Sequence, residues 1–307
     1  MSDEVMLCAE VIMTKGEYNQ TGLLWTWAND EWHEGNPSVI GPNDQGFWLS
    51  ATVFDGARAI AGNLPDLDLH CSRAIRSAEI LGLKSPVPVE TIIELAREGT
   101  MKFPQDSELY ISPIFYAQTG FVVEPNPEST QFLLIVQESP LPSQLGFSAC
   151  LSRFRRPSRD AAPTDAKASC LYPNVARSVA EAKSKGFDTG IVLDPNGNIA
   201  EFSYANLFMV KDGVVHTPAI NGTFLNGITR QRIIKLLQND GIKVEERPID
   251  CEELNDVDEL FSTGNFAKVM PCNNFQGNIL PLGPIALRAR ELYFNFASNS
   301  KIKAIKN

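Results

Sequence analysis

The sequence predicts a mixed α/β (α+β) protein with two domains, and three observations support this fold class. The chain has 307 residues, and length alone suggests roughly two domains of ~150 residues each. Segments with apolar residues at helical spacing alternate with segments rich in β-branched and aromatic residues. Residues 138–146 hold two prolines, two serines and a glycine, which is typical of a linker. We therefore expect a small N-terminal domain over residues 1–137 and a larger C-terminal domain over residues 147–307.

The small domain is expected to combine a sheet with two helices. Residues 23–33 predict a strand, a turn and a return strand, because aromatic residues flank the turn-forming sequence NDE. Helical spacing of apolar residues predicts helices over residues 69–83 and 89–103, and Gly82 is a stop signal near the end of the first. Further strands are expected at residues 51–60, 107–120 and 130–137.

The large domain shows the same two kinds of pattern. Residues 188–218 predict three consecutive strands, with DPNG and KDG as hairpin turns, because Asn-Gly and Asp-Gly favour positive φ. A strand is expected near residues 147–156, and residues 258–272 predict a strand, a glycine turn and another strand. Helices are expected over residues 172–186, 227–241 and 284–298.

The composition argues against several classes of function. The formal net charge is -10, and so acidic a chain repels phosphate backbones and anionic membranes, so we expect no nucleic-acid or membrane partner. No apolar run approaches the ~20 residues of a membrane helix. Residues 1–16 lack a basic segment before their apolar stretch, which argues against a signal peptide and favours a cytoplasmic protein. The histidines are far apart and the cysteines form no C-x-x-C pair, so no metal site is expected.

Lys167 is a candidate for covalent chemistry. It lies in PTDAKASCLYPN, where the small neighbours Ala166, Ala168 and Ser169 would let a planar ligand come close. A lysine that forms a Schiff base must be partly desolvated, so that its amine is not permanently protonated. Taken alone, the same pattern is also typical of a solvated surface lysine.

Two further patterns indicate a ligand with a basic ring and an anionic group. Glu201 lies in a predicted strand among apolar neighbours, so it needs a cationic partner, either a protonated pyridine nitrogen or an Arg or Lys side chain. Thr229 lies at the start of a predicted helix, whose free N–H groups can bind an anion; ordinary capping by Thr229 is the alternative. Arg73 could add a charged fork to the same anion, although Arg76 is equally placed by periodicity.

Taken together, these segments resemble the class IV aminotransferase family, which includes branched-chain aminotransferases, D-amino-acid aminotransferases, (R)-amine transaminases and aminodeoxychorismate lyase. The resemblance covers nearly the whole chain in order, and the 34-residue spacing from Lys167 to Glu201 is typical of the family. It rests on the segments VFDGAR (53–58), YISP (110–113), KASCLY (167–172), EFSYANLF (201–208), LNGITR (225–230) and FSTGNFAKVMP (261–271). It implies the fold type IV of pyridoxal 5'-phosphate (PLP) enzymes, with a β-barrel-like sheet core in the large domain, PLP as cofactor and a homodimer.

The resemblance also implies roles for individual residues. Lys167 would form the Schiff base with PLP and carry the proton between Cα and C4′ in a ping-pong reaction. Glu201 would pair with the pyridine nitrogen, and Tyr172 would hydrogen-bond the phenolic oxygen. Asn265 stands where many members have a phosphate-binding threonine. The other implied cofactor contacts, mostly at the phosphate, are Arg73, Leu225, Ile228, Thr229 and Gly264.

The predicted substrate site departs from the branched-chain pattern at two positions. Tyr110 in YISP matches that group, but Ser112 stands where its Tyr-x-Arg-Pro pattern has arginine. Phe266 replaces a residue that is usually small in branched-chain enzymes. Arg58 either meets a carboxylate at the pocket mouth or is an exposed residue at a strand end. Phe54 completes the set of expected substrate contacts.

Three functions remain open from the sequence. The first is an aminotransferase that moves an amino group between a hydrophobic, branched-chain-like amino acid and a 2-oxo acid such as 2-oxoglutarate. The second is a D-amino-acid or (R)-amine transaminase, which the loss of arginine at position 112 keeps open. The third is a PLP lyase of the aminodeoxychorismate type, which needs no 2-oxo acid acceptor.

Overall fold

The computed structural model describes residues 22–300. The predicted absence of a signal peptide concerns residues 1–16, which lie outside this range, as do the outer ends of the two predicted domains. Residues 24–138 contribute the strands of one main sheet and a short hairpin, and residues 147–279 contribute the strands of a second sheet. The mixed α/β class predicted from the sequence is confirmed. Within residues 22–300, no helix is both long enough and apolar enough to span a bilayer.

The first sheet is antiparallel and has six strands. Its order is β2-β1-β8-β5-β3, and β4 also pairs with β5. The longest pairing joins β5 to β8, from Leu109 opposite Glu138 to Ala117 opposite Thr130. Buried and half-buried residues alternate along β8, as expected for a sheet with one face on a core. The strands are β1 (Leu24–Ala28), β2 (Glu31–Glu34), β3 (Thr52–Phe54), β4 (Ala57–Ala59), β5 (Leu109–Ala117) and β8 (Thr130–Glu138).

Two helices pack on this sheet. They are α2 (Leu67–Ile80) and α3 (Val89–Thr100), and their buried residues form one core with the inward side chains of the strands. Gly82 follows α2 with φ +72, a left-handed conformation that favours glycine because it has no Cβ. The stop signal expected at Gly82 is therefore confirmed.

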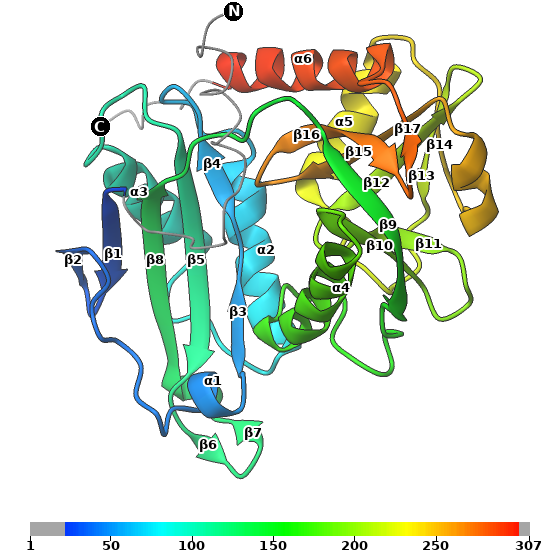
Figure 1. The fold of residues 1–307 in the computed structure, drawn as a ribbon. Coiled ribbons are helices and arrows are strands. Elements are labelled where there is room, and N and C mark those ends of the chain that lie inside the picture. Colours follow the sequence, from blue (N-terminus) through cyan, green and yellow to red (C-terminus); the bar gives the residue numbers. More distant parts are fainter. Residues whose placement is uncertain (1–21, 301–307) are drawn as a thin grey trace, which may run out of the picture.

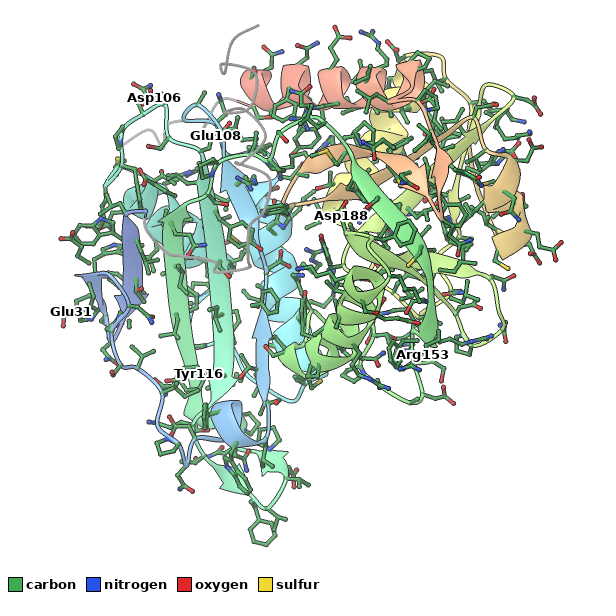
Figure 2. All side chains as sticks on the ribbon, in the orientation of Figure 1. Glu31, Asp106, Glu108, Tyr116, Arg153 and Asp188 are labelled. Carbon is green, nitrogen blue, oxygen red and sulfur yellow. The ribbon has the colours of Figure 1, made fainter. Side chains whose placement is uncertain are left out.

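One end of the first sheet is closed by α1 (Gln45–Trp48) and by the hairpin of β6 (Gly120–Phe121) and β7 (Glu124–Pro125), which is followed by the short 3-10 helix Pro127–Ser129 (Figure 1). Tyr116 lies at this end (Figure 2), where its hydroxyl donates to the carbonyl oxygen of Val39 at 2.7 Å. A Cβ at Gly46 would lie 2.6 Å from the Tyr116 Cβ, so glycine is required for α1 to approach this closely.

The second sheet has nine strands in the order β11-β10-β9-β16-β15-β12-β13-β14, with β17 paired to β16. It is mixed, because β9 runs parallel to both β10 and β16, and β13 runs parallel to β14. The strands are β9 (Phe147–Arg155), β10 (Thr189–Leu193), β11 (Ile199–Phe202), β12 (Asn206–Lys211), β13 (Val214–Pro218), β14 (Val244–Arg247), β15 (Glu259–Gly264), β16 (Lys268–Phe275) and β17 (Asn278–Ile279).

The second sheet must curl. Strands β11 and β12 are joined by residues 203–205, yet β10, β9, β16 and β15 lie between them in the sheet order. In a flat sheet the two strands would be roughly 24 Å apart, because neighbouring strands lie about 4.8 Å apart. Four Cα–Cα steps reach at most about 15 Å. The connection is therefore possible only if the sheet bends back towards a barrel, as the resemblance to fold type IV implied.

The prediction of three strands in residues 188–218 is wrong, because there are four. The chain reverses at residues 203–205, where the Phe202 N–H donates to the Ala205 carbonyl at 2.9 Å. Ser203 holds this turn through hydrogen bonds of 3.1 Å to both backbone groups of Gly190. Residues 51–60, expected as one strand, likewise form two strands, β3 and β4, that are separated by Asp55 and Gly56. Both breaks lie beside the cavity described below.

Three helices accompany the second sheet, as expected: α4 (Tyr172–Ser184), α5 (Ile228–Asn239) and α6 (Pro284–Asn299). Both α5 and α6 pack against β15 and against each other, and they share a core with β12 and β13. A 3-10 turn at Ser169–Leu171 leads into α4, and another at Cys251–Asp256 leads into β15. In Figure 1, α2 lies on the side of the first sheet that faces the second half of the chain.

Candidate active site

A cavity of about 480 Å³ lies between the two halves of the described chain, within the range of volumes typical of small-molecule sites. It is lined from both halves: by the break between β3 and β4, by α2 and β5, and by segments of the second half from Lys167 to Phe266. All predicted site residues except Arg58 contribute to its wall, namely Phe54, Arg73, Tyr110, Lys167, Tyr172, Glu201, Leu225, Ile228, Thr229, Gly264, Asn265 and Phe266.

Lys167 is half-buried in this wall and is not a surface lysine. Its backbone is anchored on both sides, because its N–H donates to Ser77 Oγ and its carbonyl accepts from the Phe54 N–H, each at 3.1 Å. The Nζ atom lies 2.5 Å from Tyr172 Oη and 4.6 Å from the centre of the Phe54 ring. Burial lowers the pKa of the Lys167 amine, so a larger fraction of it is in the neutral, nucleophilic form than in a surface lysine.

Glu201 also lines the cavity and lies in the short strand β11. Its Oε1 atom is 3.4 Å from Arg156 Nε, and both side chains are buried. Burial raises the pKa of Glu201 to about 7, although Arg156 and Lys167 act in the opposite direction. A cationic partner from an arginine, one of the two alternatives considered from the sequence, is thus present, and the carboxylate can still bind a second cation from the cavity.

We expect Glu201→Gln to flatten the pH dependence of stability in the PLP-free protein. Because the pKa is about 7 in the folded state and 4.5 without burial, the folded chain binds a proton that the unfolded chain has released. The free energy of unfolding therefore falls as pH rises from 4.5 to 7, with a slope of about 1.4 kcal/mol for each pH unit. Urea unfolding at pH 5 and pH 7.5 measures this slope. The exposed Glu94→Gln is the control, and equal slopes in wild type and Glu201→Gln would contradict the assignment.

Arg73 and Arg76, which periodicity left equivalent, are distinguished by the structure. Arg76 is exposed, whereas Arg73 is buried and donates from Nε and Nη2 to the two carboxylate oxygens of Asp55 at 2.6 and 2.8 Å. His70 Nδ1 lies 2.7 Å from Asp55 Oδ1. The Nη1 atom of Arg73 makes no hydrogen bond with another residue in the range 22–300, so it can serve an anion in the cavity.

The start of α5 forms the other side of this anion site. Gly227 is the N-cap and no side chain caps the helix, so capping by Thr229, the alternative considered from the sequence, does not occur. A Cβ at Gly227 would lie 2.1 Å from Asn206 Oδ1, so glycine is required here. Asn206 in turn donates to the Leu225 carbonyl at 3.0 Å, which fixes the loop before the helix. The first N–H groups of α5 thus face the cavity with the positive end of the helix dipole.

Arg58 does not reach the cavity wall, and it is not an exposed strand-end residue. It is fully buried, and its Nη1 donates to the carbonyl oxygen of Ser139 at 2.5 Å. Its Nε donates to the carbonyl oxygen of Asn265 at 3.0 Å, and its guanidinium lies 5.8 Å from the centre of the Phe266 ring. Arg58 therefore supports the turn at residues 264–267 from behind, and the expectation that it contacts a substrate carboxylate is not supported by this position.

Several residues that shape the cavity were missed by sequence reasoning. Asp55 is buried, accepts hydrogen bonds from Arg73 and contacts His70. Arg156 pairs with Glu201. The signal for Asp55 was present, because an aspartate interrupts an apolar strand pattern in VFDGAR. His70 and Arg73 are three residues apart on one helix, so they share a face. Arg156 carried no comparable signal, since its neighbours Arg153 and Arg155 are equally basic.

The chemistry of the wall suits PLP. The wall contains a half-buried amine, a buried carboxylate, and a guanidinium together with a helix N-terminus. These are the partners of an aldehyde, a pyridine nitrogen and a phosphate. Within residues 22–300, no cluster of His, Cys, Asp or Glu side chains is arranged to hold a metal ion.

Comparison with known proteins also indicates an aminotransferase. Residues 52–275 match the family described as amino-transferase class IV. A probable branched-chain-amino-acid aminotransferase of Rickettsia bellii is 33% identical over 264 residues, which cover 85% of this chain and 90% of that protein. The branched-chain-amino-acid aminotransferase of Pseudomonas aeruginosa is 31% identical over 263 residues, which cover 80% and 84% of the two chains.

Solved structures agree in fold as well as in sequence. An aminotransferase from Brucella abortus bound to PLP is 45% identical, with a TM-score of 0.89 over 90% of this chain and 99% of that one. The branched-chain aminotransferase of Thermoproteus uzoniensis, solved with norvaline, is 29% identical, with a TM-score of 0.83 over 92% and 97%. Fold and site define a PLP enzyme of fold type IV. The chain belongs to the class IV aminotransferase family and is a PLP-dependent transaminase.

Proposed function

We propose that this transaminase moves an amino group between a hydrophobic, branched-chain-like L-amino acid and a 2-oxo acid such as 2-oxoglutarate, in a ping-pong reaction at Lys167. The observation that carries the proposal is the half-buried Lys167 amine, 2.5 Å from the Tyr172 hydroxyl, in a cavity that is also lined by Glu201 and the start of α5. A lysine in this state can act both as a nucleophile towards a carbonyl and as an acid or base.

The division of work among the residues follows from their positions. Bound PLP supplies the electron sink for cleavage of the Cα–H bond. Lys167 would hold the cofactor and then move the proton from Cα to C4′ through Nζ. Lys167 Nζ donates to the Tyr172 hydroxyl, which orients the amine. Burial raises the pKa of Tyr172, so the phenol stays protonated and would donate to the phenolic oxygen of PLP. Glu201 would bind the pyridine nitrogen, whose positive charge stabilises the carboxylate form of this buried acid.

The phosphate is assigned to Arg73 and the first turn of α5. Asp55 holds two nitrogens of the Arg73 guanidinium, so the third points to a defined place. Ile228 would contribute its backbone N–H and Thr229 its hydroxyl, because both line the cavity at the start of α5. Holding the phosphate there would orient the cofactor relative to Lys167 and Glu201, and such positioning is a main contribution of a protein to cofactor chemistry.

The choice of a hydrophobic substrate is supported by the cavity wall and by the relatives. Phe54, Leu225 and Phe266 are apolar parts of the wall. The Rickettsia bellii and Pseudomonas aeruginosa proteins are named branched-chain-amino-acid aminotransferases, and the Thermoproteus uzoniensis enzyme was solved with norvaline. Ser112 is buried, and its hydroxyl donates to the Asp55 carbonyl at 2.9 Å, so it braces the backbone beside the cavity.

An absorbance titration of the PLP-loaded protein tests this function. L-Leucine, L-glutamate, D-alanine and an (R)-arylamine are added in turn, and the visible band of bound PLP is followed. We expect L-leucine and L-glutamate to bleach it, because they are the donor and the reverse-reaction substrate. Bleaching by D-alanine or the amine alone would reject the L-amino-acid assignment in favour of the second function considered from the sequence, with Ser112 as its cause. A yellow protein that no donor bleaches would direct the test to the lyase.

A further inference from the structure

Lys268 is a buried lysine next to the cavity residue Asn265, and the reaction described above does not use it. It is 1% exposed and is the first residue of β16. Its φ of +62 is a backbone conformation that residues other than glycine rarely adopt. Within residues 22–300, no carboxylate lies at ion-pair distance from its Nζ atom. That atom donates instead to Asn265 Oδ1 at 2.6 Å and lies 5.3 Å from the centre of the Tyr293 ring. A buried amine is unfavourable unless it has such a partner.

This contact fixes the orientation of the Asn265 amide. A lysine ammonium only donates hydrogen bonds, so the oxygen of the amide must face Lys268 and its NH2 group must face away. The Nδ2 atom indeed donates to the Ala57 carbonyl at 3.1 Å. The Tyr110 hydroxyl lies on the same side, because a Cβ at Gly56 would be 3.2 Å from Asn265 Nδ2 and 2.1 Å from Tyr110 Oη.

The backbone of the turn is held separately. Arg58 Nε donates to the Asn265 carbonyl at 3.0 Å, and Arg290 Nη1 donates to the carbonyls of Ala267 and Val269 at 3.0 and 2.8 Å. These contacts place the turn, but they leave the amide of Asn265 able to rotate by half a turn. Two contacts select one of its two orientations: Lys268 donates to Oδ1, and the Ala57 carbonyl accepts from Nδ2.

We propose that Lys268 is a positioning residue that holds the Asn265 amide as a donor to Tyr110, so that the Tyr110 hydroxyl donates its own proton to the substrate carboxylate. The chain of hydrogen bonds runs from Lys268 through Asn265 to Tyr110, and both Tyr110 and Phe266 line the cavity. Burial raises the pKa of Tyr110, whereas the hydrogen bond from Asn265 lowers it, which agrees with an amide that donates to the phenol oxygen. The inference rests on the proposed function, because it requires a substrate with a carboxylate.

The orientation should depend on pH near neutrality. Burial and the neighbouring Arg58 lower the pKa of Lys268 to about 7, and Asp66 and Asp55 oppose this shift. A neutral amine can accept as well as donate, so it no longer adds to the preference for one amide orientation, which then rests on the Ala57 carbonyl alone. An anion in the cavity favours the ammonium form, so carboxylate affinity should fall as pH rises from 6 to 8. The charged or titratable groups around Lys268 are Asp55, Arg58, Asp66, His70, Arg290 and Tyr293.

The test measures binding of 4-methylvalerate, a carboxylate without an amino or keto group, to the PLP-loaded protein by titration calorimetry. Lys268→Met keeps the side-chain length and removes the donor, and the exposed Lys235→Met is the matched control. We expect Lys268→Met to weaken binding about tenfold, as for the loss of one hydrogen bond. Asn265→Ala should have the same effect. The fall in affinity from pH 6 to pH 8 should be smaller in Lys268→Met than in wild type.

A double-mutant cycle separates positioning from a structural role. If Lys268 acts through Asn265, adding Lys268→Met to Asn265→Ala should change the affinity by less than about twofold. A full tenfold loss in that background, unchanged binding by Lys268→Met, or no binding to wild type would each overturn the proposal. Asn265→Ala tests the same relay without touching Lys268, should Lys268→Met fail to fold. Intact 4-methylvalerate binding without bleaching by L-leucine would reject the proposed donor and leave this relay standing.

Discussion

Replacing Lys167 by alanine is expected to lower the rate of amino-group transfer by at least about 10⁴-fold, the upper range for one positioned proton-transfer group. The variant loses both the amine that would hold PLP and the group that would move the proton. Tyr172 cannot take over either role, because burial raises the pKa of its hydroxyl and keeps the phenol protonated. Single-turnover reaction with L-leucine, followed by absorbance, measures the loss.

The same variant gives a second result that does not depend on turnover. Borohydride reduction of the PLP-loaded wild type should fix the cofactor to the peptide that contains Lys167, as mass spectrometry would show. The Lys167→Ala protein should yield no such adduct, and the exposed Lys235→Met should behave like wild type. A reduced adduct on Lys268 in the wild type, or full activity of Lys167→Ala, would contradict the assignment.

Replacing Asp55 by alanine is expected to lower the free energy of unfolding by about 3–5 kcal/mol at pH 7, as for other broken buried ion pairs. Asp55 is fully buried, and its loss would leave the Arg73 guanidinium without its partner in the interior. Burial alone would raise the pKa of Asp55, but Arg73 and His70 hold it well below the usual value of 3.8. The contribution to stability is therefore present above pH 3.8 and is lost as pH falls below that value.

Chemical denaturation followed by tryptophan fluorescence measures this effect. Asp106→Ala is the matched control, because Asp106 is exposed at the outer edge of the first half of the chain (Figure 2). The difference in unfolding free energy between the two variants should shrink as pH is lowered from 7 to 3. Two variants that agree within about 0.5 kcal/mol at pH 7 would show that Asp55 contributes no more than a surface residue.

The sequence by itself determined the kinds of elements and most of their bounds. Helical spacing predicted α2, α3, α4, α5 and α6, and turn residues marked the hairpin of β1 and β2, because these signals are local. It also indicated the identity of the site, since Lys167, Glu201 and the start of α5 lie in segments whose order and spacing resemble one family.

The tertiary structure alone decided how those residues are used. Arg73, and not Arg76, faces the cavity region because its guanidinium pairs with Asp55, which is distant in the sequence. Arg58 is held away from the cavity wall by the carbonyl of Ser139, another distant partner. The breaks at residues 55–56 and 203–205 arise because the chain must bend around the cavity while its backbone groups find distant partners, such as Gly190. Burial, which sets the pKa values of Lys167, Glu201 and Lys268, depends on the packing of both halves. Periodicity reports which face of an element is apolar, but only packing determines what that face meets.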